Sequence, residues 1–181
     1  MSLRLFAALE IPGAVAARLI AIQRGVPGAA WRPRENLHLT LRFFGEVAEP
    51  VADDIDAALS EAALRARPFD LRLKGTGVFG KDEPNALWIG AEASAALADL
   101  AAACERAARK AGLKPEPRKF TPHVTIAYLR NPDRDRLIAF EQRYALFETQ
   151  PWRVDRFALF SSRIRKSAPS VYALEADYQL G

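Results

Sequence analysis

Residues 34–41 of the chain read Arg-Glu-Asn-Leu-His-Leu-Thr-Leu, and residues 119–126 read Lys-Phe-Thr-Pro-His-Val-Thr-Ile. Both stretches contain the pattern His-apolar-Thr-apolar, which begins at His38 and at His123. The chain has 2 histidines, so each of them begins one copy. Alternation of polar and apolar side chains is typical of a half-buried strand, in which residues i and i+2 share a face. We therefore predict two strands, each with a histidine and a threonine on one face.

The repetition is improbable as an accident of composition. With 5 threonines among 181 residues, chance would place a threonine two positions after both histidines roughly 1 time in 1,000, and most short-motif matches arise far more often. We therefore take His38, Thr40, His123 and Thr125 as the candidate site residues.

Size and composition favour a globular protein. A chain of 181 residues suits one domain, or two small lobes that share a core, and 50% hydrophobic residues argue against disorder. Lysine and arginine (26) exceed aspartate and glutamate (22), which gives a net charge of +4. This excess permits an anionic ligand, but proteins that coat nucleic acid are usually much more basic.

The single cysteine, Cys104, excludes an internal disulfide and fits a reducing compartment. It shares the apolar stripe of a predicted helix with Leu97, so we interpret it as a core thiol and not as a nucleophile. The first ten residues are too short, and too soon interrupted by Glu10, for a signal peptide, and no apolar run approaches membrane-spanning length. We predict a soluble, cytoplasmic protein with no membrane partner.

Strand and helix patterns follow one another with no low-complexity linker. The predicted strands are residues 3–9, 38–44, 69–78, 86–91, 123–129, 152–162 and 171–174. The predicted helices begin near Pro12, Pro50, Ser94 and Asn131. This order predicts an α+β fold of two similar lobes, each with one His-x-Thr strand.

Several local features have a structural interpretation. Residues 31–34 are expected to form a connector, and Gly45 to end the first motif strand. Residues 75–77 (Gly-Thr-Gly) are expected to form a bulge or kink, because their spacing matches neither a P-loop nor a dinucleotide-binding loop. The acidic residues of the second helix are interpreted as a solvated face and not as a metal site. They are Asp53, Asp54, Asp56 and Glu61.

The two histidines could act together as a general base and a general acid, because the unperturbed pKa of imidazole is about 6.5. Each threonine hydroxyl, one pleat away, is suited to donate a hydrogen bond to an oxyanion. In-line displacement at phosphorus needs proton removal on one side and proton delivery on the other. The pattern therefore predicts a substrate with a phosphorus centre.

Two other interpretations are open. The histidines could hold a metal, but a zinc site normally has three or four ligands, and with Cys104 placed in a helix core the other ligands would have to be carboxylates. They could also be polar residues at strand starts with only a structural role. The repetition of the pattern favours the catalytic interpretation over both.

Stretches along nearly the whole chain carry a resemblance. They are residues 4–8, 35–47, 77–80, 87–90, 120–127 and 159–162. In these stretches the chain resembles the two-histidine (2H) phosphoesterases and, among them, the bacterial RNA 2′,3′-cyclic phosphodiesterases, also called 2′-5′ RNA ligase-like proteins. The doubled His-x-Thr pattern is the most specific part of the resemblance.

The resemblance implies one bilobal, pseudo-twofold α+β domain over residues 1–181, with two antiparallel sheets, helices outside and an active-site groove between the lobes. It implies a metal-independent hydrolase, with no cofactor, that opens a 2′,3′-cyclic phosphate on an RNA end or a nucleotide to a 2′-phosphomonoester. By analogy, His38 is the proton donor and His123 the proton acceptor that activates water. Thr40 and Thr125 would bind the non-bridging phosphate oxygens. We expect the protein to act as a monomer.

One position departs from the pattern of many relatives, which carry a phosphate-binding arginine five residues after the second histidine. That position is Tyr128 here, and the nearest arginine is Arg130. Simple alternation from His123 would place both on the opposite face unless the strand bulges. The other basic residues that could supply charge are Arg42, Lys119, Arg163, Arg165 and Lys166.

Three rival functions use the same residues. One is a phosphodiesterase for a small nucleotide such as an ADP-ribose cyclic phosphate, and another is 2′-5′ RNA ligation. The third is a non-catalytic RNA- or nucleotide-binding module, which would not require two proton-transferring groups. An RNA strand would need a basic track with stacking aromatic residues beyond the phosphate. The candidates for stacking are Trp31, Phe43, Phe79 and Trp152.

Overall fold

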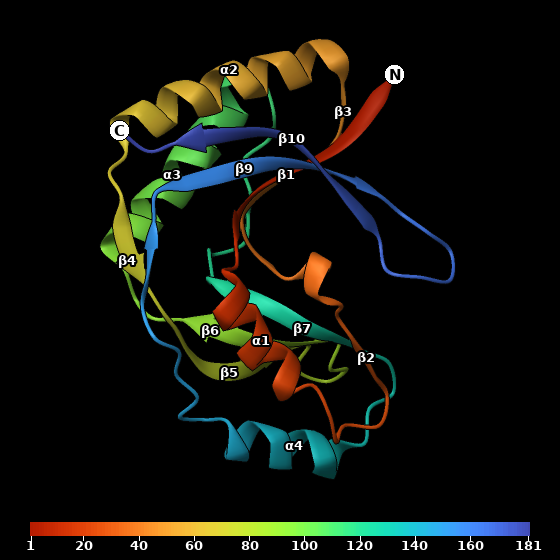
Figure 1. Ribbon diagram of the computed structural model, residues 1–181. Helices are drawn as coiled ribbons and strands as arrows, with labels where there is room; N and C mark the ends of the chain where they lie inside the picture. Colours follow the sequence, from red (N-terminus) through yellow and green to blue (C-terminus); the bar gives the residue numbers. More distant parts are fainter.

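The chain forms two lobes, each built on antiparallel strands (Figure 1). The computed structural model describes residues 1–181. The strands are β1 (Ser2–Glu10), β2 (Ala29–Trp31), β3 (His38–Ala48), β4 (Phe69–Leu71), β5 (Leu73–Phe79), β6 (Ala86–Ala91), β7 (His123–Leu129), β8 (Trp152–Val154), β9 (Arg156–Arg163) and β10 (Val171–Gln179). The helices are α1 (Gly13–Ala21), the 3-10 helix η1 (Arg34–Asn36), α2 (Glu49–Arg65), α3 (Ala95–Lys110) and α4 (Arg134–Arg143).

The strands of the two lobes meet edge to edge. In one lobe β10, β9, β1 and β3 are neighbours in that order, and in the other β7 is followed by β6 and β5, while β2 also pairs with β7. A single residue pair, Leu39 with Val124, joins β3 to β7. Strands β4 and β8 form a separate two-stranded sheet. The predicted α+β class and bilobal antiparallel arrangement are confirmed, with the addition that the two sheets are joined at this pair.

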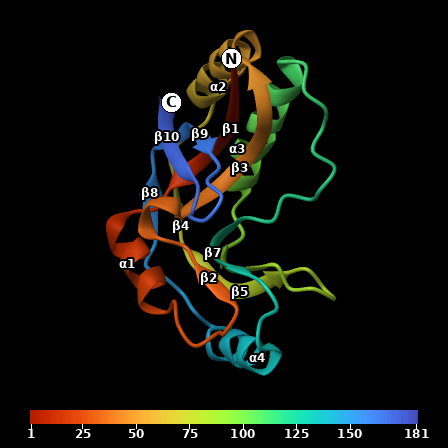
Figure 2. The same cartoon turned by 90° about the vertical axis from the view of Figure 1, so that its right-hand side faces the viewer.

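Helices cover the apolar faces of the lobes. In Figure 1, α2 and α3 lie with β1, β3, β9 and β10, whereas α1 and α4 lie with β7 and its neighbours. Figure 2 shows the segment between α3 and β7 running along one side of the molecule from one lobe to the other. One cluster of 41 buried residues extends through both lobes, so they share a continuous hydrophobic core. None of the helices combines the length and the apolar character that crossing a membrane requires.

Gly45 explains why strand β3 is longer than predicted. Strand β3 does not end at Gly45 but runs to Ala48. Gly45 adopts a φ of 75°, and the register with β1 shifts between Leu5 and Phe6, so the glycine forms a bulge within the strand. The predicted bulge at residues 75–77 is confirmed, because the register between β5 and β6 shifts between Leu73 and Thr76.

The other differences arise where a segment changes its pairing partner. Residues 69–78 divide at Arg72 into β4, which pairs with β8, and β5, which pairs with β6. Residues 152–162 divide at Asp155 in the same way. Strand β10 extends to Gln179, five residues beyond the predicted end. The expected connector at residues 31–34 is shorter than predicted, because Trp31 belongs to β2 and Arg34 to η1. The fourth helix is capped by Asp133, whose carboxylate accepts a hydrogen bond from Arg136 N, and not by Asn131.

Cys104 and the acidic residues of α2, which were interpreted as structural, lie as expected. Cys104 is fully buried, and burial raises the pKa of its thiol to about 12, which makes it a core residue and not a nucleophile. Asp53 and Asp54 are exposed on α2, where Asp56 accepts a hydrogen bond from the Tyr178 hydroxyl at 2.5 Å. Glu61 forms an ion pair with Lys110 at 2.9 Å.

A Gly77→Ala substitution should destabilise the protein by about 1–3 kcal/mol, because a Cβ at this position would lie 2.3 Å from Cζ2 of Trp88. Chemical unfolding with urea measures the loss. Gly13→Ala is the matched control, because its Cβ would meet only the end of the flexible Arg34 side chain. Equal stability of the two variants would show that the packing of Trp88 on Gly77 is unimportant.

Candidate active site

The four predicted site residues lie on one face of two adjacent strands. Leu39 of β3 faces Val124 of β7 in an antiparallel pair, and both are fully buried. Antiparallel register then brings His38 toward Thr125 and Thr40 toward His123 across the strand junction. These four side chains are partly accessible, and the intervening residues of both strands are buried. The predicted alternation is therefore confirmed in both strands.

His123 is oriented by a backbone hydrogen bond. Its Nδ1 donates to the carbonyl of Thr121 at 2.5 Å, which leaves Nε2 free to exchange a proton. The ring lies edge-on to Phe79 at a centroid distance of 4.8 Å and 5.8 Å from Trp88. Burial among these groups lowers the pKa of His123, and the hydrogen bond to Thr121 partly offsets that effect.

His38 lies in a similar aromatic environment formed by the other lobe. Its ring is 4.8 Å from Phe6 and 5.2 Å from Tyr172, measured between centroids. Its Nδ1 is buried and has no hydrogen bond of good geometry. Burial lowers the pKa of His38 to about 4; the nearby carbonyl of Asn36 opposes the shift, while the charges of Arg32 and His123 add to it. The effect of His123 on the pKa of His38 agrees with the strand register, which places the two imidazoles near one another.

The site threonines have hydroxyls available for a ligand. Among the threonines of the chain, Thr76 donates a side-chain hydrogen bond to a carbonyl, and Thr149 accepts one from a backbone N–H. Thr40 and Thr125 form no side-chain hydrogen bond, and neither hydroxyl is buried without a partner. They are therefore free to donate to negatively charged oxygens.

Tyr128 lies on the histidine side of β7, contrary to simple alternation. The register with β6 shifts so that Trp88 faces Thr125 and Leu87 faces Ala127. The extra residue reverses the alternation, so that Ala127 and Leu129 are buried while Tyr128 is half exposed. The exception stated for a bulged strand therefore applies, and Tyr128 faces the same side as His123.

A buried arginine that sequence reasoning missed also reaches the site. Arg32 follows β2, stacks on the Tyr128 ring and affects the pKa of His38. Of the basic residues suggested by sequence, Arg42 is held by Glu105 at 2.5 Å and by the Lys114 carbonyl at 2.8 Å. The others are exposed: Lys119, Arg130, Arg163, Arg165 and Lys166. The sequence could have indicated the position of Arg32 only through β2, the strand that directly precedes it. A strand of three residues is too short to be predicted from periodicity.

One of the four aromatic candidates contacts a histidine, and a second packs on a ring that does. Phe79 contacts His123, and Phe43 lies 5.5 Å from Phe6, which itself contacts His38. Trp31 instead packs against Phe140 of α4 at 6.0 Å. Trp152 lines a different cavity. The described residues include no group of three or more His, Cys, Asp or Glu side chains arranged to hold a metal ion.

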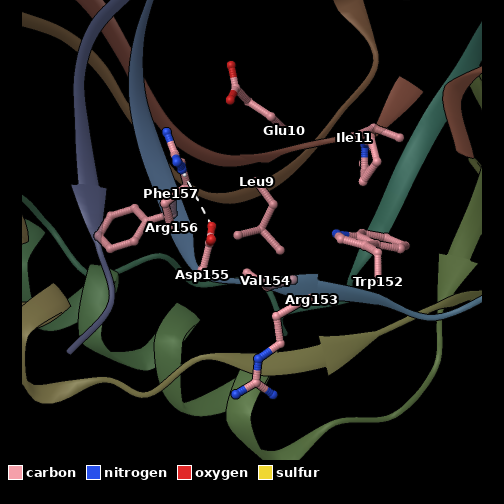
Figure 3. Close-up of a pocket in the computed structure, with 10 residues that line it drawn as sticks. Leu9, Glu10, Ile11, Trp152, Arg153, Val154, Asp155, Arg156 and Phe157 are labelled. Atoms are coloured by element: carbon pink, nitrogen blue, oxygen red, sulfur yellow. Dashed lines mark ion pairs between the residues drawn. The ribbon is translucent and has the colours of Figure 1, made fainter. Parts of the chain in front are cut away.

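The cavity that contains Trp152 is separate from the histidines. It has a volume of about 430 Å³ and lies between the end of β1 and strands β8 and β9 (Figure 3). Its charged residues include Asp155 and Arg156, which form an ion pair at 3.5 Å, and neither histidine lines it. Its lining therefore offers no group for proton transfer comparable to the paired imidazoles.

Comparison with sequence families matches residues 11–163 to the 2′-5′ RNA ligase superfamily. The chain belongs to this superfamily. A protein from Aquifex aeolicus, named RNA 2′,3′-cyclic phosphodiesterase, is 34% identical over 154 residues, which cover 83% of this chain and 81% of that protein. A protein of the same name from Thermus thermophilus is 32% identical over 182 residues, covering 96% and 88% of the two chains.

Solved structures share the fold of this chain. The crystal structure of TT0787 of Thermus thermophilus matches with a TM-score of 0.81 and 27% identity, covering 98% of this chain and 97% of that chain. Escherichia coli LigT complexed with 3′-AMP matches with a TM-score of 0.79 and 22% identity, covering 99% of both chains.

The lowered pKa of His38 should make stability depend on pH. Because the folded-state pKa of about 4 lies below the unfolded value of 6.5, the unfolded chain binds more protons between these values, and stability falls as pH drops through this window. Between pH 7 and pH 4, the wild type should lose about 2–3 kcal/mol more than a His38→Gln variant. Urea unfolding at both pH values measures the difference, and equal losses would contradict it. His123→Gln serves as a comparison, with an effect of the same sign.

Proposed function

We propose that this protein hydrolyses 2′,3′-cyclic phosphates on RNA ends or nucleotides to 2′-phosphomonoesters. The observation that carries the proposal is the placement of two imidazoles and two free hydroxyls on one face across the β3–β7 junction. The names of the relatives from Aquifex aeolicus and Thermus thermophilus support the substrate class.

The proposed reaction is an in-line displacement at phosphorus. His123 accepts a proton from water through Nε2, since Nδ1 is held by Thr121. The water oxygen forms a bond to phosphorus as the bond from phosphorus to the ribose 3′ oxygen breaks. His38 donates a proton to that leaving oxygen, and the products are a 2′-phosphomonoester and a 3′ hydroxyl. Solvent then returns both histidines to their starting protonation states.

Residues around the two histidines would assist the proposed reaction. Thr40 and Thr125 would donate hydrogen bonds to the non-bridging oxygens, where negative charge accumulates. Burial and the charge of Arg32 disfavour protonation of His38 in the empty site. A bound phosphate anion would raise the pKa of His38 by its charge and so load the proposed proton donor.

The proposed reaction requires no metal, because the two imidazoles supply both proton transfers. All four residues come from one chain, which supports action as a monomer. An RNA-end substrate and the free thiol of Cys104 favour the cytoplasm as the site of action.

Replacing either histidine with alanine should lower kcat/KM by at least about 100-fold, because each removes one proton transfer. The assay uses excess chelator and compares RNA ending in a 2′,3′-cyclic phosphate with cyclic mononucleotides. Arg153→Ala, in the cavity of Figure 3, is the control and should leave both activities unchanged. Failure of the wild type to cleave either substrate would refute the proposed function.

A substrate with a good leaving group separates the two histidine roles. On a nucleotide p-nitrophenyl phosphodiester, whose leaving group needs no protonation, His38→Ala should lose less than about tenfold activity. His123→Ala should lose as much as it does on a cyclic phosphate, because the water must still be activated. The opposite pattern would exchange donor and acceptor.

A further inference from the structure

Arg32 is a buried cation without an acidic partner. Its residue is 8% exposed, and no aspartate or glutamate forms an ion pair with it. Its contacts are with two tyrosines: Nη2 donates a hydrogen bond to the Tyr172 hydroxyl at 3.3 Å, and Cζ lies 4.8 Å from the centre of the Tyr128 ring. Both partners are formally neutral.

The backbone places Arg32 on the histidine side of the sheet. Ala30 of β2 faces Tyr128 of β7, and the Arg32 N–H donates to the carbonyl of Ile126 at 2.9 Å. Arg32 is two residues after Ala30 and therefore projects to the same face as Tyr128. Gln23 donates a side-chain hydrogen bond to the Arg32 carbonyl at 3.0 Å, which further holds this segment.

Tyrosine cannot neutralise this guanidinium. Burial raises the pKa of Tyr128, so its phenol stays protonated at neutral pH. An uncompensated buried charge is costly, and proteins normally pair it with an opposite charge. The charge of Arg32 reaches His38. The absent counter-charge therefore belongs in the space in front of the histidines, where an anionic ligand would bind.

We propose that Arg32 binds the substrate phosphate, donating from its guanidinium to the non-bridging oxygens, while Tyr128 and Tyr172 hold the plane of the guanidinium. The planar fork of arginine matches phosphate geometry and is weakly hydrated, which suits a buried site. Arg32 follows β2 and stacks on Tyr128 of β7, so the positive charge comes from the β2 segment and β7 supplies only the ring beneath it. The inference deepens the proposed function and rests on it for the identity of the phosphate.

Arg130, another basic residue near β7, provides a matched control for Arg32. Arg130 lies beyond the end of β7 and is exposed, so it tests whether any nearby positive charge suffices. Two substitutions test Arg32: Arg32→Met removes the charge, and Arg32→Lys keeps the charge but removes the fork.

Two measurements are made on each variant: the Kd of inorganic phosphate by calorimetry, and kcat/KM for a 2′,3′-cyclic mononucleotide. Arg32→Met should weaken phosphate binding at least about tenfold and lower kcat/KM by about 100- to 1,000-fold. Arg32→Lys should show an intermediate loss of about tenfold. Arg130→Ala should stay within about twofold of the wild type.

Thermal unfolding distinguishes ligand binding from a structural role. Arg32→Met should unfold at the wild-type temperature or above it, because a buried unpaired charge is removed. If Arg32→Met does not fold, Arg32→Lys carries the same test. Phosphate binding and kcat/KM at wild-type levels in the Arg32 variants would overturn the proposal. Phosphate binding that depends on Arg32, in a protein that cleaves no cyclic phosphate, would uphold this site and refute only the proposed function.

Discussion

The candidate site depends on one backbone pairing, that of Leu39 with Val124. This is the single point at which the strands of the two lobes meet, and its antiparallel direction sets which side chains share a face. With these two apolar residues fully buried, the polar residue on either side of each must project to the opposite face. A slip of one residue in this pairing would turn one motif strand over relative to the other, and its histidine would point into the core. The hydrophobic core thus fixes the position of the reactive groups.

His38 and His123 have similar aromatic neighbours but differ in their hydrogen bonds and nearby charges. Each imidazole lies against aromatic rings of its own lobe, Phe6 and Tyr172 for His38, and Phe79 and Trp88 for His123. His123 donates to a backbone carbonyl, whereas Nδ1 of His38 lacks a partner of good geometry. Burial lowers the pKa of both imidazoles, and the charge of Arg32 adds to this effect only at His38. Two histidines in related sequence contexts therefore acquire different proton affinities.

The neighbourhood of the histidines also explains the residue at position 128. A bulge in β7 turns Tyr128 toward the site, and β2 brings Arg32 over its ring. The positive charge near the histidines is thus supplied by the segment between β2 and η1, which leads into the first motif strand, and not by β7. Arg42, the basic residue closest to the first motif, is instead bound to Glu105 of α3.

The sequence by itself determined the two motif strands, their alternation and the α+β class, and it proposed the four candidate site residues, because these follow from short-range periodicity. The candidates are His38, Thr40, His123 and Thr125. It also determined that Cys104 is a core residue. Only the tertiary structure decided that the lobes join at Leu39 and Val124, that β3 passes through Gly45, that Tyr128 turns inward and that Arg32 reaches the histidines. These features depend on which strands pair and where the register shifts. Pairing and register are set by contacts between distant residues, which local sequence patterns do not encode.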